Sequence, residues 1–154
     1  MKTKKIAAAF VGFFLFALLG VQGCGVTQQP IKLNELEGVW VLKTINGREV
    51  SASFSKTLPT LQFDFKEKLL HGSGGCNRYS TRFVLVNNHM TTSPVLSTRM
   101  MCLDPNIENE FFRTLETESW LFVKKGILTF RNEKNVVIME FQPKRSQTML
   151  AEKE

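Results

Sequence analysis

Two short segments near the middle of the chain constrain its fold most: Gly72-Ser73-Gly74-Gly75-Cys76-Asn77-Arg78-Tyr79 and, further on, Thr98-Arg99-Met100-Met101-Cys102. Three glycines so close together indicate backbone that needs unusual dihedral angles or a very close neighbour. A phosphate-binding P-loop would need a Lys and a Ser or Thr after its last glycine, but Cys76-Asn77 follows here. We therefore expect a glycine-bearing bulge or a barrel corner at the first segment.

Short alternating patterns surround these segments and predict strands. In the first strand, Trp40 and Leu42 are expected on one face, and Val39, Val41 and Ile45 on the other. Asn46-Gly47 predicts a tight turn, because both residues tolerate positive φ. The expected strands are 36–45, 61–65, 82–87, 90–93, 95–101, 120–123, 127–131 and 136–141, of which the last three should form an antiparallel meander.

The pattern after Cys102 predicts a helix. Asp104-Pro105 has the residue types preferred at the N-cap and the first helical position. An apolar stripe follows, which should pack on the sheet or plug one end of a barrel. Glutamates, including Glu108, are expected on the opposite, solvated face. The stripe consists of Ile107, Phe111, Phe112 and Leu115.

The N-terminal segment has the form of a secretory signal. A basic start precedes an apolar run over 6–21, which is shorter than a membrane span usually needs. Val21-Gln22-Gly23-Cys24 resembles the bacterial lipobox, in which Cys24 would receive lipid. Ordinary cleavage nearby and an uncleaved anchor are the alternatives. We expect a signal peptide at 1–23, a tether at 24–33, a folded domain at 34–142 and a disordered tail at 143–154.

Charge argues against nucleic acid as a partner. The chain of 154 residues carries a formal net charge of +6, but Lys2, Lys4 and Lys5 lie in the signal segment. The rest is only mildly basic, and it has no basic helix or lysine-arginine stripe with interleaved aromatics.

Cys76 and Cys102 have three interpretations. A structural disulfide is favoured, because a secreted domain meets an oxidising compartment and because the mature domain holds an even number of cysteines once Cys24 is acylated. Its loop would stabilise by about 3.5 kcal/mol on the chain-entropy model. A pair of buried thiols and a redox pair or nucleophile are the alternatives.

The remaining candidates for chemistry are few. Histidines occur only at His71 and His89, and the spacing of cysteines and histidines does not fit a structural zinc site. We expect no metal, no cofactor and no enzymatic activity. Asn77, Arg78 and Arg99 have two interpretations: they bond nearby backbone and helix acids, or they contact an anion or lipid headgroup at a barrel mouth.

Taken together, the two opening segments, the run from Glu108 through Phe111-Phe112 to Leu115, and the closing residues Leu128, Phe130 and Phe141 resemble the META domain, or HslJ family. The resemblance covers roughly 33–142. Met101 stands where the family usually has Ala, a conservative change. The resemblance to the META domain implies an α+β domain: a small, curved, mostly antiparallel, barrel-like sheet with one packed helix.

The resemblance also implies a function class. Members are often bacterial envelope lipoproteins, and the family is linked to heat induction and antibiotic tolerance. The expectation is a non-enzymatic binding or assembly accessory, anchored by its N-terminal lipid and facing the periplasm from the outer membrane, with an envelope protein as partner. The alternative is a carrier of lipid or a small apolar ligand, by analogy of shape with pilot lipoproteins.

Overall fold

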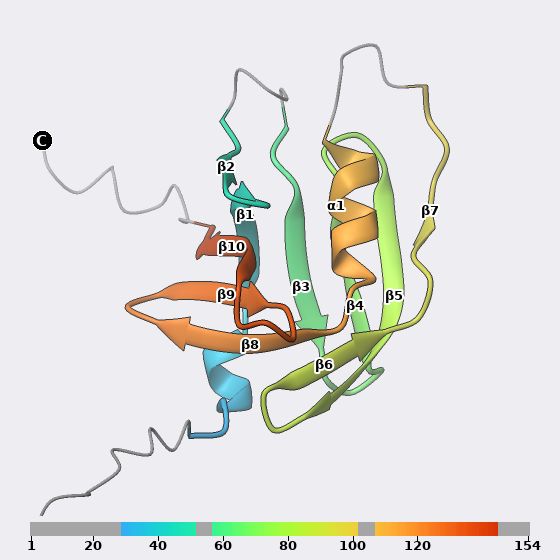
Figure 1. Ribbon diagram of the computed structural model, residues 1–154. Coiled ribbons are helices and arrows are strands. Elements are labelled where there is room, and N and C mark those ends of the chain that lie inside the picture. Colours follow the sequence, from blue (N-terminus) through green and yellow to red (C-terminus); the bar gives the residue numbers. More distant parts are fainter. Residues whose placement is uncertain (1–28, 52–56, 102–106, 145–154) are drawn as a thin grey trace, which may run out of the picture.

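The computed structural model describes residues 29–51, 57–101 and 107–144 (Figure 1). In this part of the chain a curved sheet surrounds an apolar core, and one α-helix packs against it. The elements are η1 Leu33–Leu36, β1 Val39–Ile45, β2 Arg48–Glu49, β3 Thr60–Asp64, β4 Leu69–Ser73, β5 Arg78–Val86, β6 His89–Thr92, β7 Leu96–Ser97, α1 Glu108–Leu115, β8 Ser119–Lys124, β9 Ile127–Arg131 and β10 Val137–Pro143.

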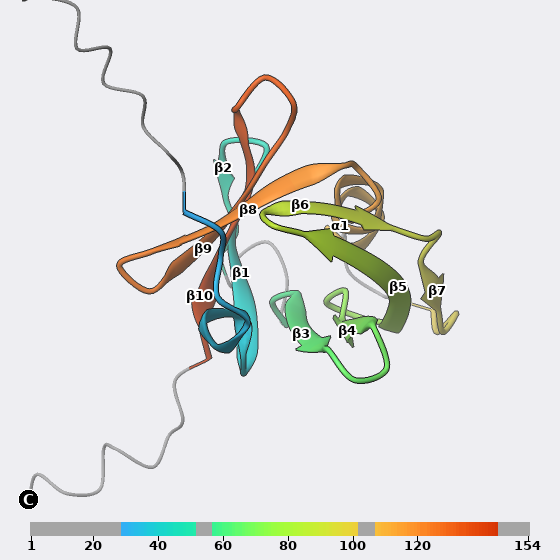
Figure 2. The ribbon, with the colours of Figure 1, turned by 90° about the horizontal axis from the view of Figure 1, so that it is seen from below.

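The sheet closes on itself. Its antiparallel pairs run from β1 through β3, β4, β5, β6, β8 and β9 to β10, and β10 pairs back with β1. The two shortest strands lie beside this ring, with β2 on β1 and β7 on β5. The view from below shows the strands arranged around a common interior (Figure 2). The predicted class, a curved antiparallel sheet with a packed helix, is confirmed.

Tight turns lie where the residue types predicted them. Asn46 and Gly47 have φ values of 47° and 77°, which turn β1 back into β2. Asn87, with φ 55°, begins the turn between β5 and β6. The late strands β8, β9 and β10 form the expected antiparallel meander.

The core confirms most of the predicted strand faces. Trp40 and Leu42 are buried, and Val39 and Val41 are less so. Ile45 was expected on the same face as Val39 and Val41, but it is buried like Trp40 and Leu42. The reason is a β-bulge between Leu42 and Thr44, which shifts the alternation by one residue.

The helix buries its apolar stripe as predicted, but one acid joins it. Phe111 and Leu115 are inaccessible to solvent, and Ile107 is nearly so. The predicted helix start at Asp104-Pro105 lies outside the described residues. Glu108 was expected on the solvated face and is instead only 7% exposed, because it faces the glycine-rich segment.

The two ends of the described domain are tied to the barrel. Ile31 packs against the core and Leu33 begins η1, so the region assigned to the tether includes ordered residues. Strand β10 extends through Pro143, and the amide of Lys144 donates to the carbonyl of Val39. Among the helices of the described residues, none is long and apolar enough to span a bilayer.

Candidate functional site

The side chain of Asn77 joins three parts of the domain. Its Oδ1 accepts hydrogen bonds from the backbone N–H of Met100 at 2.7 Å and from Oγ1 of Thr98 at 2.9 Å. Its Nδ2 donates to Oε1 of Glu108 at 2.8 Å. Asn77 is 4% exposed, so these bonds are made out of solvent. The residue thus fixes the segment after β7 and the first turn of α1 to the start of β5.

Glu108 completes this network from the helix. Its Oε2 accepts the backbone N–H of Asn77 at 2.6 Å and that of Cys76 at 3.3 Å. A buried carboxylate is costly unless hydrogen bonds satisfy it. Here three N–H groups point at one carboxyl, which explains how Glu108 tolerates burial.

The glycines allow this arrangement through close approach. A Cβ added at Gly74 would lie 2.6 Å from Cζ of Phe112 and 2.7 Å from Cγ of Glu108. A Cβ added at Gly72 would lie 2.2 Å from the carbonyl oxygen of Thr60. Gly75 has φ 112°, a conformation that favours glycine. The prediction that these glycines meet very close neighbours or need unusual dihedral angles is confirmed.

An apolar surface lies beside the network. The segment 95–101 runs along β5 through the short β7, and three of its side chains are well exposed: Leu96 at 73%, Met100 at 61% and Met101 at 89%. Next to it is an open groove of about 500 Å³, whose lining includes Arg99 and Phe112. We call Leu96, Met100 and Met101 the β7 surface.

The three residues of the predicted anion site do not lie in one environment: Asn77 is internal, whereas Arg78 and Arg99 are at the surface. Asn77 is buried and bonded internally, which is the structural interpretation. Arg78 and Arg99 are exposed, and Arg99 borders the groove. Contact with an anion or a lipid headgroup therefore stays a prediction for Arg78 and Arg99 only.

The predicted cysteine sites lie largely outside the description. Cys24 and Cys102 are both among the residues that are not described. Cys76 lies next to Asn77, at the end of the glycine-rich segment. Its pairing with Cys102 and the lipidation of Cys24 stay predictions.

The histidines lie apart from this network. His71 is half-buried in β4, opposite Gln62 and Ser80. His89 stacks on Trp120 with ring centroids 4.6 Å apart, and its Nε2 lies 3.5 Å from Glu118. Within the three described ranges, no group of three His, Cys, Asp or Glu residues could hold a metal ion.

Two groups near the helix have shifted pKa values. Burial raises the pKa of Tyr79, whose hydroxyl donates to the carbonyl of Thr60 at 3.0 Å. For Glu110, partial burial acts to raise the pKa, but hydrogen bonds from Asn46 and Arg48 and the charge of Arg48 hold it below its usual value. The hydrogen bond of Tyr79 joins β5 to the start of β3, and the contacts of Glu110 join α1 to β2 and to the turn before it, so both stabilise the barrel.

Sequence reasoning missed a second polar anchor, Asn88, at the other end of β5. It is 9% exposed, and its Nδ2 donates to the carbonyl of Leu121 at 2.9 Å. Its Oδ1 accepts the backbone N–H of Ile31 at 3.1 Å. Asn87-Asn88-His89 has the residue types of a turn, but these residue types give no sign of partners so distant along the chain.

These observations define a class of protein: a small closed antiparallel barrel, with a helix fixed to it by an internally satisfied polar network. The family comparison gives the membership. The model of the META domain matches residues 32–145, and the chain belongs to this family.

Relatives agree with this assignment. The chain is 32% identical to the heat shock protein HslJ of Escherichia coli (strain K12), over 72% of this chain and 74% of that protein. Two NMR structures are similar in fold. One has a TM-score of 0.56 at 25% identity and covers 73% of this chain and 94% of the other. The second, from Burkholderia xenovorans, has a TM-score of 0.58 at 20% identity over 79% and 94%.

Proposed function

We propose that this META-domain protein is a non-enzymatic accessory of the bacterial cell envelope, anchored by lipid on Cys24, that binds a protein partner through the β7 surface. The observation that carries the proposal is the exposure of Leu96, Met100 and Met101 on one held segment. Exposed apolar patches mark interaction sites, and here three exposed apolar side chains lie within six residues of one another in the sequence. Methionine suits such surfaces because its side chain is flexible and polarisable.

The network behind this surface supports the same function. Asn77 bonds both Thr98 and Met100, so the segment is held in place before any partner arrives. A surface that is already ordered loses less entropy on binding. A disulfide between Cys76 and Cys102 would hold the segment further, and we include it in the proposal.

The core weighs against the alternative, a carrier of lipid inside the barrel. Phe63, Phe83 and Phe111 are buried, and the rings of Phe63 and Phe83 meet edge to face with centroids 5.5 Å apart. Phe111 and Phe141 are also in ring contact, at 6.4 Å. These side chains occupy the interior that an acyl chain would need.

A stress role is supported by the name of the relative HslJ, a heat shock protein. We therefore propose that loss of this protein sensitises the cell to heat or to antibiotics. The test uses a deletion strain of the source bacterium, complemented with the wild-type chain or with the L96E/M101E variant. Survival of both stresses should return with the wild type and not with the variant.

The matched control is V136E. Val136 is 55% exposed but lies in the β9–β10 turn, away from β7. Equal levels of the three proteins in membrane fractions must accompany the survival data. Full rescue by L96E/M101E would contradict binding through the β7 surface, and soluble wild-type protein without incorporated fatty acid would contradict the anchor.

A further inference from the structure

The chain enters the barrel at one defined end. The hydrogen bond from Ile31 to Asn88 fixes residue 31 to the turn between β5 and β6. Asn88 is held in turn by Leu121 of β8. Figures 1 and 2 show the described part of the chain beginning beside this end, where the blue segment leads into η1.

The length of the tether limits where this end can lie. Ile31 follows Cys24 by seven positions in the sequence, and even a fully extended chain over those seven steps spans at most about 25 Å. If Cys24 carries the lipid, the β5–β6 end must stay within that distance of the bilayer surface. This step rests on the proposed function.

The same end presents apolar side chains to solvent. Leu33 is 52% exposed, and Val84 and Val86 are each 60% exposed. Leu33 and Val84 line a hollow of about 240 Å³ together with Phe65 and Phe83. We call Leu33, Phe65, Val84 and Val86 the hairpin surface.

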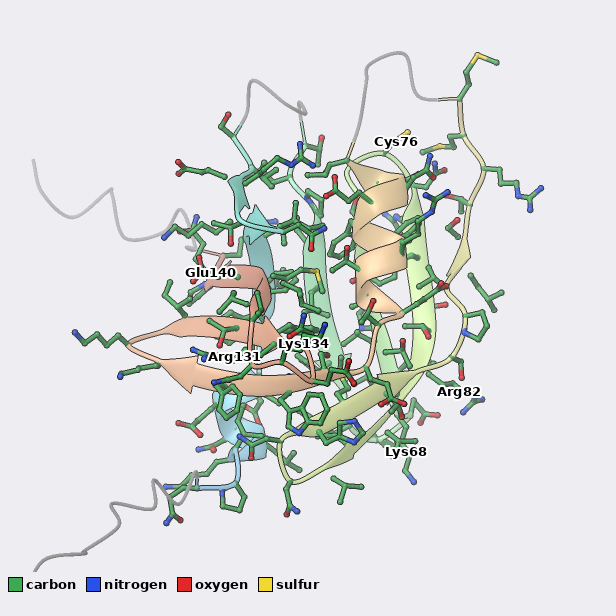
Figure 3. All side chains as sticks on the ribbon, viewed as in Figure 1. Lys68, Cys76, Arg82, Arg131, Lys134 and Glu140 are labelled. Carbon is green, nitrogen blue, oxygen red and sulfur yellow. The ribbon has the colours of Figure 1, made fainter. Side chains whose placement is uncertain are left out.

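Basic side chains border it. Lys68 lines the hollow, and Arg82 lies on the same outward face of β5 as Val84 and Val86. The amide of Phe83 donates to the carbonyl of Lys68, which holds the two strands together here. Figure 3 shows Lys68 and Arg82 at the end of the domain opposite Cys76.

We propose that the hairpin surface docks on the phospholipid bilayer to which the protein is anchored, with Leu33, Val84 and Val86 at the acyl boundary and Lys68 and Arg82 against lipid phosphates. Apolar side chains flanked by cations are what an interfacial membrane contact uses. The position of the anchor selects the bilayer over a protein partner, because any surface at this end is confined near lipid.

This contact sets the orientation of the whole domain. Strand β5 runs from Arg78 to Val86, a length of about 27 Å at the usual rise per residue. With its Val86 end on the membrane, its Arg78 end and the neighbouring β7 surface face away from the bilayer. A partner in the periplasm then meets the β7 surface unobstructed.

The test uses the lipidated protein, purified from a bacterial envelope and reconstituted into vesicles of phosphatidylethanolamine and phosphatidylglycerol. Tryptophan is added at one position at a time, as V84W or V86W, with V136W as the control on another hairpin. The native Trp40 and Trp120 also fluoresce, so the signal of the wild-type protein in the same vesicles is subtracted from that of each variant. Vesicles with brominated acyl chains quench tryptophan that reaches the acyl boundary. We expect about a twofold greater loss of fluorescence for V84W and V86W than for V136W, because interfacial groups penetrate to the headgroup–acyl boundary.

Each outcome has one meaning. Equal quenching at the three positions, in protein that floats with the vesicles, overturns the docking and leaves the anchor intact. Protein that does not float with the vesicles overturns the anchor itself, and the docking with it. Circular dichroism matching the wild type shows that each tryptophan variant is folded.

Discussion

Strand β5 has a buried asparagine near each of its ends, and the two asparagines hold different parts of the chain. Asn77 precedes the strand and makes bonds to Thr98, Met100 and Glu108, all within the barrel and its helix. Asn88 follows the strand and bonds Leu121 and the incoming chain at Ile31. The first closes the fold at the helix end, whereas the second attaches the domain to what precedes it.

The difference shows how one strand separates two functions. At the Asn77 end the polar groups are satisfied by one another, and an apolar segment is displayed beside them. At the Asn88 end the aromatic rings of Phe63, Phe65 and Phe83 pack together with centroid distances of 5.5–5.9 Å and leave a hollow open to solvent. We therefore expect damage at the first end to reduce stability most, and damage at the second to release the incoming chain at Ile31.

The largest effect is expected for N77A. It removes the Nδ2 donor to Glu108 and the Oδ1 acceptor of the Met100 N–H. The buried carboxylate of Glu108 then has fewer partners, at a cost of about 4 kcal/mol in the free energy of unfolding. Urea denaturation followed by circular dichroism measures this. N77D, which sets a second carboxylate against Glu108, should be at least as destabilised at neutral pH.

N109A serves as the control for N77A, because Asn109 is exposed on the same helix turn as Glu108. If N77A unfolds at the same urea concentration as N109A, the hydrogen-bond network of Asn77 and Glu108 does not contribute to the free energy of unfolding.

N88A is expected to cost about 2 kcal/mol, because two backbone groups lose their partner. Its distinctive result is local: the backbone N–H of Ile31 should exchange with deuterium much faster, whereas that of Met100 should not. The N77A variant should show the reverse order. Unchanged exchange at Ile31 in N88A would contradict the attachment of the incoming chain at this end.

Y79F is expected to cost about 1 kcal/mol, since the carbonyl of Thr60 loses the phenolic donor. Burial raises the pKa of Tyr79, so its contribution is present below the unfolded-state pKa and is lost as the pH rises. The chain holds a single tyrosine, so its ultraviolet titration reports this group alone. Titration at the pKa of a free tyrosine would contradict the burial.

The smallest effect is expected for E110Q, because Glu110 is partly solvated. The pKa of this carboxyl is lowered, so its stabilising contribution is present at neutral pH and is lost as the pH falls through the folded-state pKa. Thermal melting of the two proteins should differ at neutral pH and converge in acid. A constant difference at every pH would exclude the ion pair with Arg48 as its cause.

Local patterns predicted most of the strands, but β2 and β4 were not expected, and β5 begins four residues before the expected position. Strand alternation and Asn-Gly pairs act between residues close in sequence, so Leu61 and Phe63, or Asn46 and Gly47, indicate their own conformation. The burial of Glu108 was not predictable in this way, because its partners at Cys76 and Asn77 lie more than 30 residues away.

The face of Ile45 was wrongly predicted and the partners of Asn88 were not predicted, for related reasons. A bulge within β1, which no residue type announces, reversed the face of Ile45. Asn88 has the residue type of an ordinary turn, and its bonds to Ile31 and Leu121 depend on how distant strands meet. In each case the residue types indicated the local conformation, whereas the burial and the hydrogen-bond partners depend on how the strands pair in the closed sheet.

The pairing of β1 with β10 joins the beginning of the domain to its end: Trp40 lies opposite Pro143, and Val39 accepts the amide of Lys144. Contacts so far apart in sequence make folding slow, since a long loop must close first. Until β10 arrives, β1 and β9 expose unpaired backbone that invites aggregation. A chain cut short before Met139 would therefore leave the sheet open, and nearly the complete domain must be synthesised before the barrel can close.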